Sequence, residues 1–401
     1  MKQIAAFLWI VLCSQALLAQ DIAQEKVDRF FSELMDYKNQ DIETLFAESF
    51  INQVPAATLE QYLKIFEEKY GNFVKAEIKE GRNLTIHYSR ATMPGIIGFD
   101  DQGKVNTLWF GQPKMKEDSF DKIRAELESM TDEVSVCVTK NDQPIFEINP
   151  DQPLAIGSAF KLYVLQALKA KIENGEMNWD DIILLDPAHQ SLPSGILQNW
   201  PAQTPLTVRT VANLMISISD NTATDILIAR LGRDYIEKFA PETMRPFLTT
   251  LEMFKLKYAG TIRYARKYAK ANLAARREML REIKVMDKSR VKEENVLSPS
   301  YVKEIEWLAS TRQLCGAIAS LRDCESISIN QGLANKDDWQ SVGFKGGSEP
   351  GVLNYTHVLT GADGSVYAVS ATVNNEEKIV DENKEFTLVV TRIIDLLAAE
   401  K

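Results

Sequence analysis

A serine and a lysine stand three positions apart in GSAFKLYVL, residues 157–165, a segment that is otherwise largely apolar. If a helix begins near Ser158, the side chains of Ser158 and Lys161 lie on one helix face. A hydroxyl at a helix N-terminus lies among unpaired backbone N–H groups, which stabilise negative charge. Burial lowers the pKa of a lysine, and the neutral amine can take the proton of a neighbouring hydroxyl. The alternative is a helix-capping serine followed by a lysine that reaches solvent.

Other nucleophile and cofactor patterns are absent from the sequence. The three histidines, His87, His189 and His357, lie in no HExxH or HxH pattern, which argues against a zinc hydrolase. No GxxxxGKS or GxxxxGKT loop predicts phosphate binding, and no GxSxG turn predicts an α/β-hydrolase. We therefore expect neither a metal nor another cofactor.

Two further motifs follow Ser158 and Lys161 along the chain. The triplet SDN, residues 219–221, lies between two apolar helical patterns, and KGG, residues 345–347, ends the strand-like segment SVGF. Alone, the first reads as a capping turn and the second as the end of a strand. In the order SxxK, SDN, KGG, the three motifs resemble those of the superfamily of class A β-lactamases and penicillin-binding proteins, over residues 118–401.

The resemblance implies a role for each matching residue. The implied catalytic residues are Ser158, Lys161, Ser219 and Lys345. The implied substrate-binding residues are Asn221, Gly347 and Ser348. The first serine would form the acyl-enzyme with the first lysine as its base, and the second serine would pass the proton to the leaving group. The second lysine would attract a substrate carboxylate, and the backbone N–H groups of Ser158 and Ser348 would form the oxyanion hole.

The sequence departs from the family pattern at two points. The third motif is usually Lys-Thr-Gly, but Gly346 takes the middle position, and Ser348 offers a replacement hydroxyl. The Glu-x-x-Leu-Asn string of class A β-lactamases, whose glutamate activates the deacylating water, is absent. The nearest candidate base is Glu252, although Thr249-x-x-Glu252 is also a capping box. We therefore expect slow hydrolysis of the acyl-enzyme.

The predicted function is that of an exported serine hydrolase that forms an acyl-enzyme on Ser158 and slowly hydrolyses a β-lactam amide. One alternative is a D-alanyl-D-alanine peptidase or a carboxylesterase. An alternative from another class is a sensor that is acylated once without turnover. In each case the partner is a small molecule or peptide that carries a carboxylate.

The N-terminus predicts export. Residues 1–19 combine one lysine, an apolar run and a small residue at the expected cleavage site, as in a signal peptide. Leu12 disfavours a lipoprotein anchor at Cys13, and no later apolar run is long enough for a transmembrane helix. We expect a secreted or periplasmic protein, and the net charge of −10 argues against nucleic-acid binding.

Two domains are predicted after the signal peptide. Helical spacing over 24–70 and strand-like alternation over 73–110 predict an α+β domain at 20–115. Its helices followed by a curled antiparallel sheet resemble the cone-shaped fold of steroid isomerases and nuclear transport factor 2. Residues 116–401 would form the β-lactamase/transpeptidase-like domain, with an antiparallel sheet built from both domain termini and a helical subdomain between them. The combination resembles the two-domain serine hydrolase of clavulanic-acid biosynthesis.

Two features leave alternatives open. Residues 255–292 hold thirteen Lys or Arg and three acidic residues, which fits either a solvated helix pair or a basic rim for anionic partners. Cys315 and Cys324 are near in sequence and could form a disulfide in an exported protein, or remain free buried thiols. Cys137 lies in a strand-like apolar segment and is expected in the core.

Overall fold

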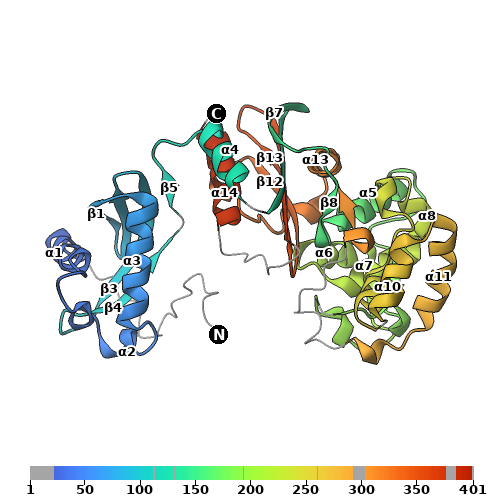
Figure 1. Ribbon diagram of the computed structural model, residues 1–401, viewed down its shortest axis with the longest axis horizontal. Coiled ribbons are helices and arrows are strands. Elements are labelled where there is room, and N and C mark those ends of the chain that lie inside the picture. The colour runs from blue at the N-terminus through green and yellow to red at the C-terminus, as the bar shows by residue number, and fades with distance from the viewer. Residues whose placement is uncertain are drawn as a thin grey trace. The chain divides into compact units, whose positions relative to one another are not determined.

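The computed structural model describes residues 22–111, 113–130, 132–192, 194–259, 261–291, 303–375 and 385–399. They form two compact units, one that ends at Ser119 and one that begins at Phe120 (Figure 1). The expected signal peptide, residues 1–19, lies outside the described residues. Within the described ranges, no helix is long and apolar enough to cross a membrane.

The first unit packs helices against an antiparallel sheet. Its elements are α1 (Gln24–Met35), η1 (Ile42–Leu45), α2 (Glu48–Ile51), α3 (Ala56–Tyr70), β1 (Phe73–Glu80), β2 (Asn83–Tyr88), β3 (Ala91–Phe99), β4 (Val105–Phe110) and β5 (Lys114–Met115). The strand order is β1-β2-β3-β4, and β5 pairs with β3. The buried side of α1 repeats every three to four residues, at Val27, Phe30, Phe31 and Leu34, as an amphipathic helix requires. The predicted order of helices and then strands is confirmed, and the likeness to the cone-shaped fold stays a prediction.

The second unit is built around a five-stranded antiparallel sheet in the order β12-β13-β14-β6-β7. The strands are β6 (Glu133–Lys140), β7 (Gln143–Ile148), β12 (Ser341–Glu349), β13 (Val352–Thr360) and β14 (Val366–Asn374). Both ends of the unit therefore contribute strands, as predicted. On one face, α4 (Phe120–Ser129) and α14 (Glu385–Ala399) pack side by side (Figure 1).

The other face of this sheet carries the helical part of the unit. Its longer helices are α5 (Lys161–Glu173), α6 (Val208–Ser217), α7 (Asn221–Leu231), α10 (Ile262–Lys270), α11 (Leu273–Val285) and α13 (Thr311–Ala319). Its shorter elements are β8 (Leu154–Ala155), η2 (Gly157–Phe160), β9 (Ile182–Leu184), η3 (Pro187–His189), η4 (Leu197–Asn199), β10 (Pro205–Thr207), α8 (Arg233–Ile236), η5 (Glu242–Met244), α9 (Thr250–Phe254), the π-helical η6 (Lys255–Ala259), η7 (Lys288–Arg290), η8 (Lys303–Ile305), β11 (Leu308–Ala309), η9 (Glu325–Ser328) and η10 (Lys336–Asp338).

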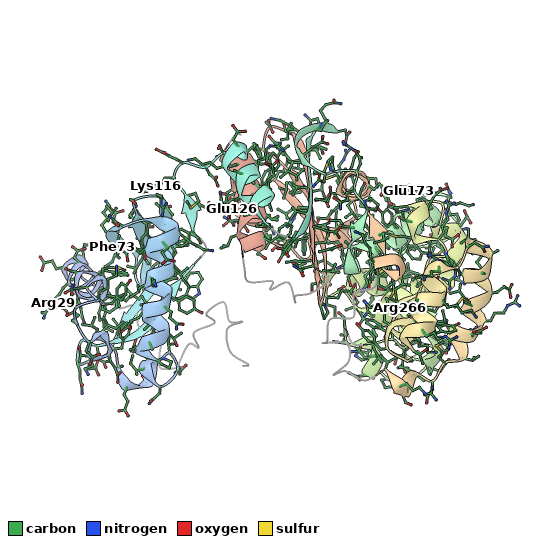
Figure 2. All side chains as sticks on the ribbon, viewed as in Figure 1. Arg29, Phe73, Lys116, Glu126, Glu173 and Arg266 are labelled. Atoms are coloured by element: carbon green, nitrogen blue, oxygen red, sulfur yellow. The ribbon has the colours of Figure 1, made fainter. Side chains whose placement is uncertain are left out.

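The basic segment forms the helix pair α10 and α11. Arg263, Arg266, Lys267 and Lys270 are exposed on α10, where Figure 2 labels Arg266. The opposite side of α10 is buried against the core. The solvated helix pair that the sequence predicts is therefore present, and a role as a basic rim stays a prediction.

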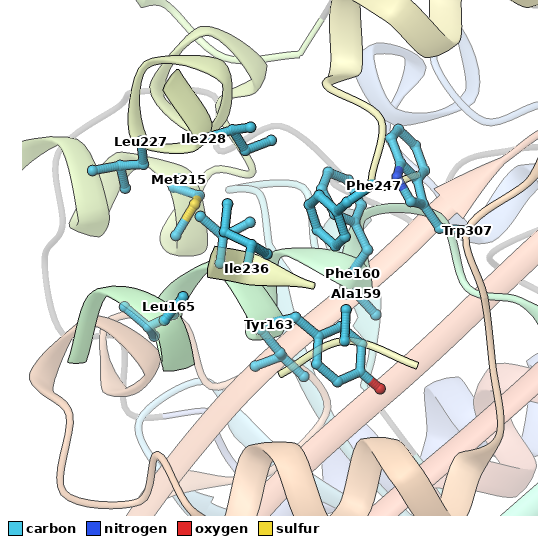
Figure 3. Packing of buried hydrophobic residues seen from close by; sticks show 14 of the residues in the cluster. Ala159, Phe160, Tyr163, Leu165, Met215, Leu227, Ile228, Ile236, Phe247 and Trp307 are labelled. Carbon is cyan, nitrogen blue, oxygen red and sulfur yellow. The ribbon is translucent and has the colours of Figure 1, made fainter. Parts of the chain in front are cut away.

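A single apolar core surrounds α5 and explains why a lysine can be buried there. Every residue from Lys161 to Leu165 is buried, so this first part of α5 has no solvent face. Just before it, the Phe160 ring stacks on Trp307 at 3.9 Å and meets the edge of Phe247 at 5.7 Å (Figure 3). Because these rings fill the space around the start of α5, the Lys161 side chain is held among other protein groups.

Two glycines let η2 approach the edge strand β12. Gly157 has φ +48°, a left-handed conformation that favours glycine. A Cβ atom on Gly347 would lie 2.1 Å from the Ile156 carbonyl oxygen and 2.5 Å from the Ser158 nitrogen. The two backbones can meet this closely only without that side chain.

We therefore expect Gly347→Ala to push η2 away from β12. Overpacking of this kind should lower the free energy of unfolding by about 1–3 kcal/mol, as measured by chemical denaturation. Gly316→Ala is the matched control, because a Cβ at this exposed helical position meets nothing within 4 Å. Equal stability of the Gly347→Ala variant and the native protein would contradict the close approach.

Candidate active site

The structure brings three separated chain segments together around Lys161. They are η2 with Ser158, the turn at residues 219–221, and strand β12 with Lys345. Ser158 is partly exposed in η2, whereas Lys161 one turn later is completely buried. The predicted placement of both residues at the start of a helix is thus seen in the structure.

The Lys161 ammonium group is hydrogen-bonded to the 219–221 turn. Its Nζ donates to the Ser219 carbonyl oxygen at 2.6 Å, to Ser219 Oγ at 3.0 Å and to Asn221 Oδ1 at 2.7 Å. Burial, followed by the charge of Lys345, holds the Lys161 pKa well below the ordinary lysine value, although Asp225 and Asp220 act in the opposite direction. The arrangement therefore favours proton release from this lysine.

Ser219 Oγ lies between two buried lysine nitrogens. Lys345 Nζ donates to it at 3.2 Å, opposite the 3.0 Å contact from Lys161. Burial lowers the pKa of Lys345 to about 7. Because two ammonium charges this close repel each other, the pair favours a state in which one amine is neutral. A proton can then pass between the two lysine nitrogens through the Ser219 hydroxyl.

The conformation of the turn is fixed by Asp220. Ser219 has φ +58°, which is uncommon for a residue with a side chain. The Asp220 carboxylate accepts hydrogen bonds from the backbone N–H groups of Ala223, Ile196 and Leu197 at 2.7–3.0 Å. Asp220 therefore caps α7 and ties the turn to residues 196–197, while the Ser219 side chain is directed at the two lysines.

Both ends of the Asn221 side-chain amide are hydrogen-bonded to other groups of the protein. Its Oδ1 accepts from Lys161, and its Nδ2 donates to the Leu192 carbonyl oxygen at 2.6 Å. The residue is 4% exposed. In this arrangement the amide positions Lys161, so binding a substrate amide requires the exchange of at least one of these hydrogen bonds.

Because β12 lies at the edge of the sheet, some of its backbone N–H groups are available to bind a substrate. β12 is the first strand of the sheet, so half of its N–H and C=O groups are not used in pairing with β13. A Cβ built on Gly157 would lie 3.2 Å from the Ser348 nitrogen, and one on Gly347 would lie 2.5 Å from the Ser158 nitrogen. The two nitrogens predicted for the oxyanion hole therefore lie in neighbouring backbone segments.

The missing threonine of the third motif has a structural counterpart in Phe344. A Cβ on Gly346 would lie 2.8 Å from the Phe344 ring and 2.9 Å from the Asn354 carbonyl oxygen. The ring in turn packs on His357, with centroids 4.6 Å apart. A threonine side chain would not fit here without movement of the ring, whereas Ser348 is exposed and offers its hydroxyl.

Glu252 forms the capping box that the sequence predicts. The Glu252 carboxylate accepts from the Thr249 backbone N–H at 2.8 Å, and Thr249 Oγ1 accepts from the Glu252 N–H at 3.1 Å. Arg233 Nη2 also donates to both carboxylate oxygens at 2.8 Å. These contacts hold the carboxylate at the start of α9, and nothing places it beside Ser158.

Cys137, Cys315 and Cys324 are buried free thiols, so the alternative without a Cys315–Cys324 disulfide is the one observed. The Cys315 thiol donates to the Cys137 carbonyl oxygen at 3.3 Å, which explains its place in the core. No group of three His, Cys, Asp or Glu in the described ranges could hold a metal ion.

A further group of charged residues, centred on Lys257, lies beside the segments that bear Ser158 and Ser348, and no motif in the sequence predicts it. The Lys257 Nζ lies 2.6 Å from Glu306 Oε1 and 2.7 Å from Glu349 Oε2. Glu349 directly follows Ser348, which could have drawn attention to it, but positions 257 and 306 belong to no motif.

A buried lysine beside a serine-bearing turn is compatible with serine hydrolase chemistry. Residues 119–397 match the family described as Beta-lactamase enzyme family (Beta-lactamase2). The chain belongs to this family, and this membership makes it a serine hydrolase.

Individual similarities are more distant. The chain is 28% identical over 123 residues to beta-lactamase VEB-1 of Pseudomonas aeruginosa, which spans 29% of this chain and 41% of that protein. The chain thus matches less than half the length of this curated relative. The beta-lactamase structure from Sphaerobacter thermophilus DSM 20745 is 18% identical, covers 69% of this chain and 96% of its own, and has a TM-score of 0.49. That from Francisella tularensis is 16% identical, covers 70% and 99%, and has a TM-score of 0.48.

We expect Glu252→Gln to weaken the structure and leave catalysis unchanged. Loss of the charged hydrogen bonds to Arg233 and Thr249 should lower the free energy of unfolding by about 1–3 kcal/mol. Glu242→Gln is the control, because Glu242 is 88% exposed in its pair with Arg245. Denaturation curves and the rate of p-nitrophenyl acetate hydrolysis measure the two effects. A collapse of turnover at native stability would instead identify Glu252 as a catalytic base.

Proposed function

We propose that the protein is an exported serine hydrolase that forms an acyl-enzyme on Ser158 and slowly hydrolyses a β-lactam amide. The observation that carries the proposal is the complete burial of Lys161, with its Nζ 3.0 Å from Ser219 Oγ and one helical turn after Ser158. Family membership supports the reaction class. The pattern of residues 1–19 supports export.

In the proposed acylation step, Ser158 Oγ attacks the substrate carbonyl carbon. The hydroxyl proton passes to the neutral Lys161 amine, and the negative charge on the carbonyl oxygen is stabilised by the N–H groups of Ser158 and Ser348. The bond to the leaving nitrogen then breaks. The leaving nitrogen takes a proton from Ser219 Oγ, which is replenished from Lys161 at 3.0 Å.

Lys345 has two roles in this proposal. Its charge keeps the Lys161 pKa low, and its ammonium group attracts the carboxylate of the substrate. Because burial lowers the pKa of Lys345 itself to about 7, a bound carboxylate would favour the charged form of this lysine. Substrates with a carboxylate should therefore bind best near or below neutral pH.

Slow deacylation is supported by the environment of Glu252. Arg233 and Thr249 hold the only carboxylate that the sequence offered as a deacylation base. The same observation favours the second candidate, a D-alanyl-D-alanine peptidase or carboxylesterase, and the third, a sensor that stays acylated. Relative turnover of nitrocefin, p-nitrophenyl acetate and an acyl-D-Ala-D-Ala peptide separates the first two. An adduct that persists without turnover identifies the third.

Covalent labelling tests the proposal directly. Wild-type protein incubated with a fluorescent penicillin should gain the mass of one penicilloyl group, and Ser158→Ala should gain none. Ser129→Ala is the matched control, because Ser129 lies exposed at the end of α4 and its hydroxyl donates to the Glu126 carbonyl oxygen. The absence of an adduct on wild type, or equal labelling of Ser158→Ala, would overturn the assignment.

Removal of the second lysine should change the pH dependence of acylation. Because the charge of Lys345 lowers the pKa of Lys161, Lys345→Met should raise that pKa. The base must be neutral to act, so the midpoint of the rise in acylation rate should move to higher pH. An uncharged ester, p-nitrophenyl acetate, keeps carboxylate binding out of the measurement.

The exposed residue Lys238 provides the control substitution, Lys238→Met, which removes the same charge at the surface. Its profile should match that of wild type. A midpoint that stays in place or falls in Lys345→Met would contradict the coupling of the two lysines.

A further inference from the structure

One buried ammonium group is shared by two carboxyl groups from distant parts of the chain. Lys257 Nζ lies 2.6 Å from Glu306 Oε1 and 2.7 Å from Glu349 Oε2. The side chains of Lys257 and Glu306 are 3% and 0% exposed, and that of Glu349 is 17% exposed. These three residues are called the Lys257 cluster below. Water therefore does little to screen the charges within it.

The Lys257 cluster joins the two segments that bear the proposed oxyanion-hole N–H groups. Glu306 directly precedes Trp307, whose carbonyl oxygen accepts from the Ile156 N–H at 3.0 Å. This contact extends the pairing of β8 with β11 toward the residues that lead into Ser158. On the other side, Glu349 directly follows Ser348 at the end of β12. Lys257 thus connects the chain beside Ser158 to the chain beside Ser348.

The charges of the Lys257 cluster do not balance when both carboxyl groups are ionised. Burial, followed by the charge of Glu349, raises the pKa of Glu306 to about 8, although Lys257 acts in the opposite direction. Burial alone would lower the Lys257 pKa, but the two carboxylates raise it above its ordinary value. Near neutral pH the cluster therefore holds one ammonium group, one carboxylate and one additional proton.

One buried carboxyl oxygen from each glutamate of the cluster supports the presence of this additional proton. Among the residues that the structure describes, no donor group bonds to the buried atoms Glu306 Oε2 and Glu349 Oε1. A proton on either oxygen removes the cost of one unpaired buried charge. Among the described residues, Tyr258 lies next to Lys257, and Arg245, Tyr268 and Arg276 line a small cavity together with Glu306.

We propose that the Lys257 cluster positions the two oxyanion-hole segments for acylation, and that it does so in the state that carries the additional proton. The inference rests on the proposed acyl-enzyme function. Loss of the proton leaves a net negative charge between these segments. That charge opposes the negative charge that develops on the substrate oxygen and weakens the link between Ser158 and Ser348. Lys257, Glu306 and Glu349 are positioning residues, since they act through the backbone of their neighbours.

The test compares the rate of acylation by p-nitrophenyl acetate, an uncharged ester whose binding does not depend on the charge of Lys345, from about pH 6 to about pH 9.5 in wild type and variants. Wild-type acylation should decline above about pH 8, where Glu306 ionises. Glu306→Gln keeps the shape of the side chain and cannot ionise, so this decline should disappear. Lys257→Met should slow acylation at neutral pH by less than the roughly 10²–10³-fold that loss of an oxyanion donor costs, because the donors are displaced and not removed. Lys257→Arg should restore part of the rate.

Lys38→Met is the matched control, because Lys38 forms a 2.7 Å pair with Glu67 in the other unit at 59% and 44% exposure. Thermal melting shows whether each variant is folded. If Lys257→Met does not fold, Glu306→Gln and Glu349→Gln decide the matter through their pH profiles.

The outcomes separate this inference from the proposed function. If wild type is labelled on Ser158 but the variants keep its rate and pH profile, the positioning role is overturned and the acyl-enzyme function stands. If wild type gains no adduct, the proposed function falls and the inference falls with it.

Discussion

The burial of Lys161 is the constraint on which the rest of the active site depends. Removing an ammonium group from water is costly, and the cost is offset only where polar partners and proton release are both available. Here the partners are Ser219 and Asn221, and the charge of Lys345 favours release. The apolar core around α5 leaves no route for the side chain to solvent. The same packing that stabilises this part of the unit therefore suits Lys161 to the base role proposed for it.

The second constraint is the close approach of backbones. Ser158 and Ser348 belong to segments that meet only because Gly157 and Gly347 carry no side chain. Lys257 then holds the neighbouring residues of both segments through Glu306 and Glu349. A helix start, a strand end and a polar turn thus converge from three distant parts of the sequence, and each is held by contacts outside the reacting groups.

The sequence predicted those features of the site that depend on short motifs. The three motifs predicted which residues would meet around Lys161, and Thr249-x-x-Glu252 predicted a capping box, because these patterns set short-range geometry. The sequence could not show that the Phe344 ring lies close to Gly346 or that Lys257 lies beside Glu306. Those contacts join residues far apart in the chain and follow from tertiary packing. For the same reason, the sequence could not show that the Asn221 amide is hydrogen-bonded to Lys161 and Leu192.

The active site requires that Lys161 give up its proton far more readily than an ordinary lysine. NMR titration of the protein with isotope-labelled lysine side chains measures this directly, with the Lys161 signal assigned by its loss in Lys161→Arg. We expect a pKa well below that of the surface lysines, as burial and the Lys345 charge require. A Lys161 signal that titrates together with the surface lysines would rule out its proposed role as the base.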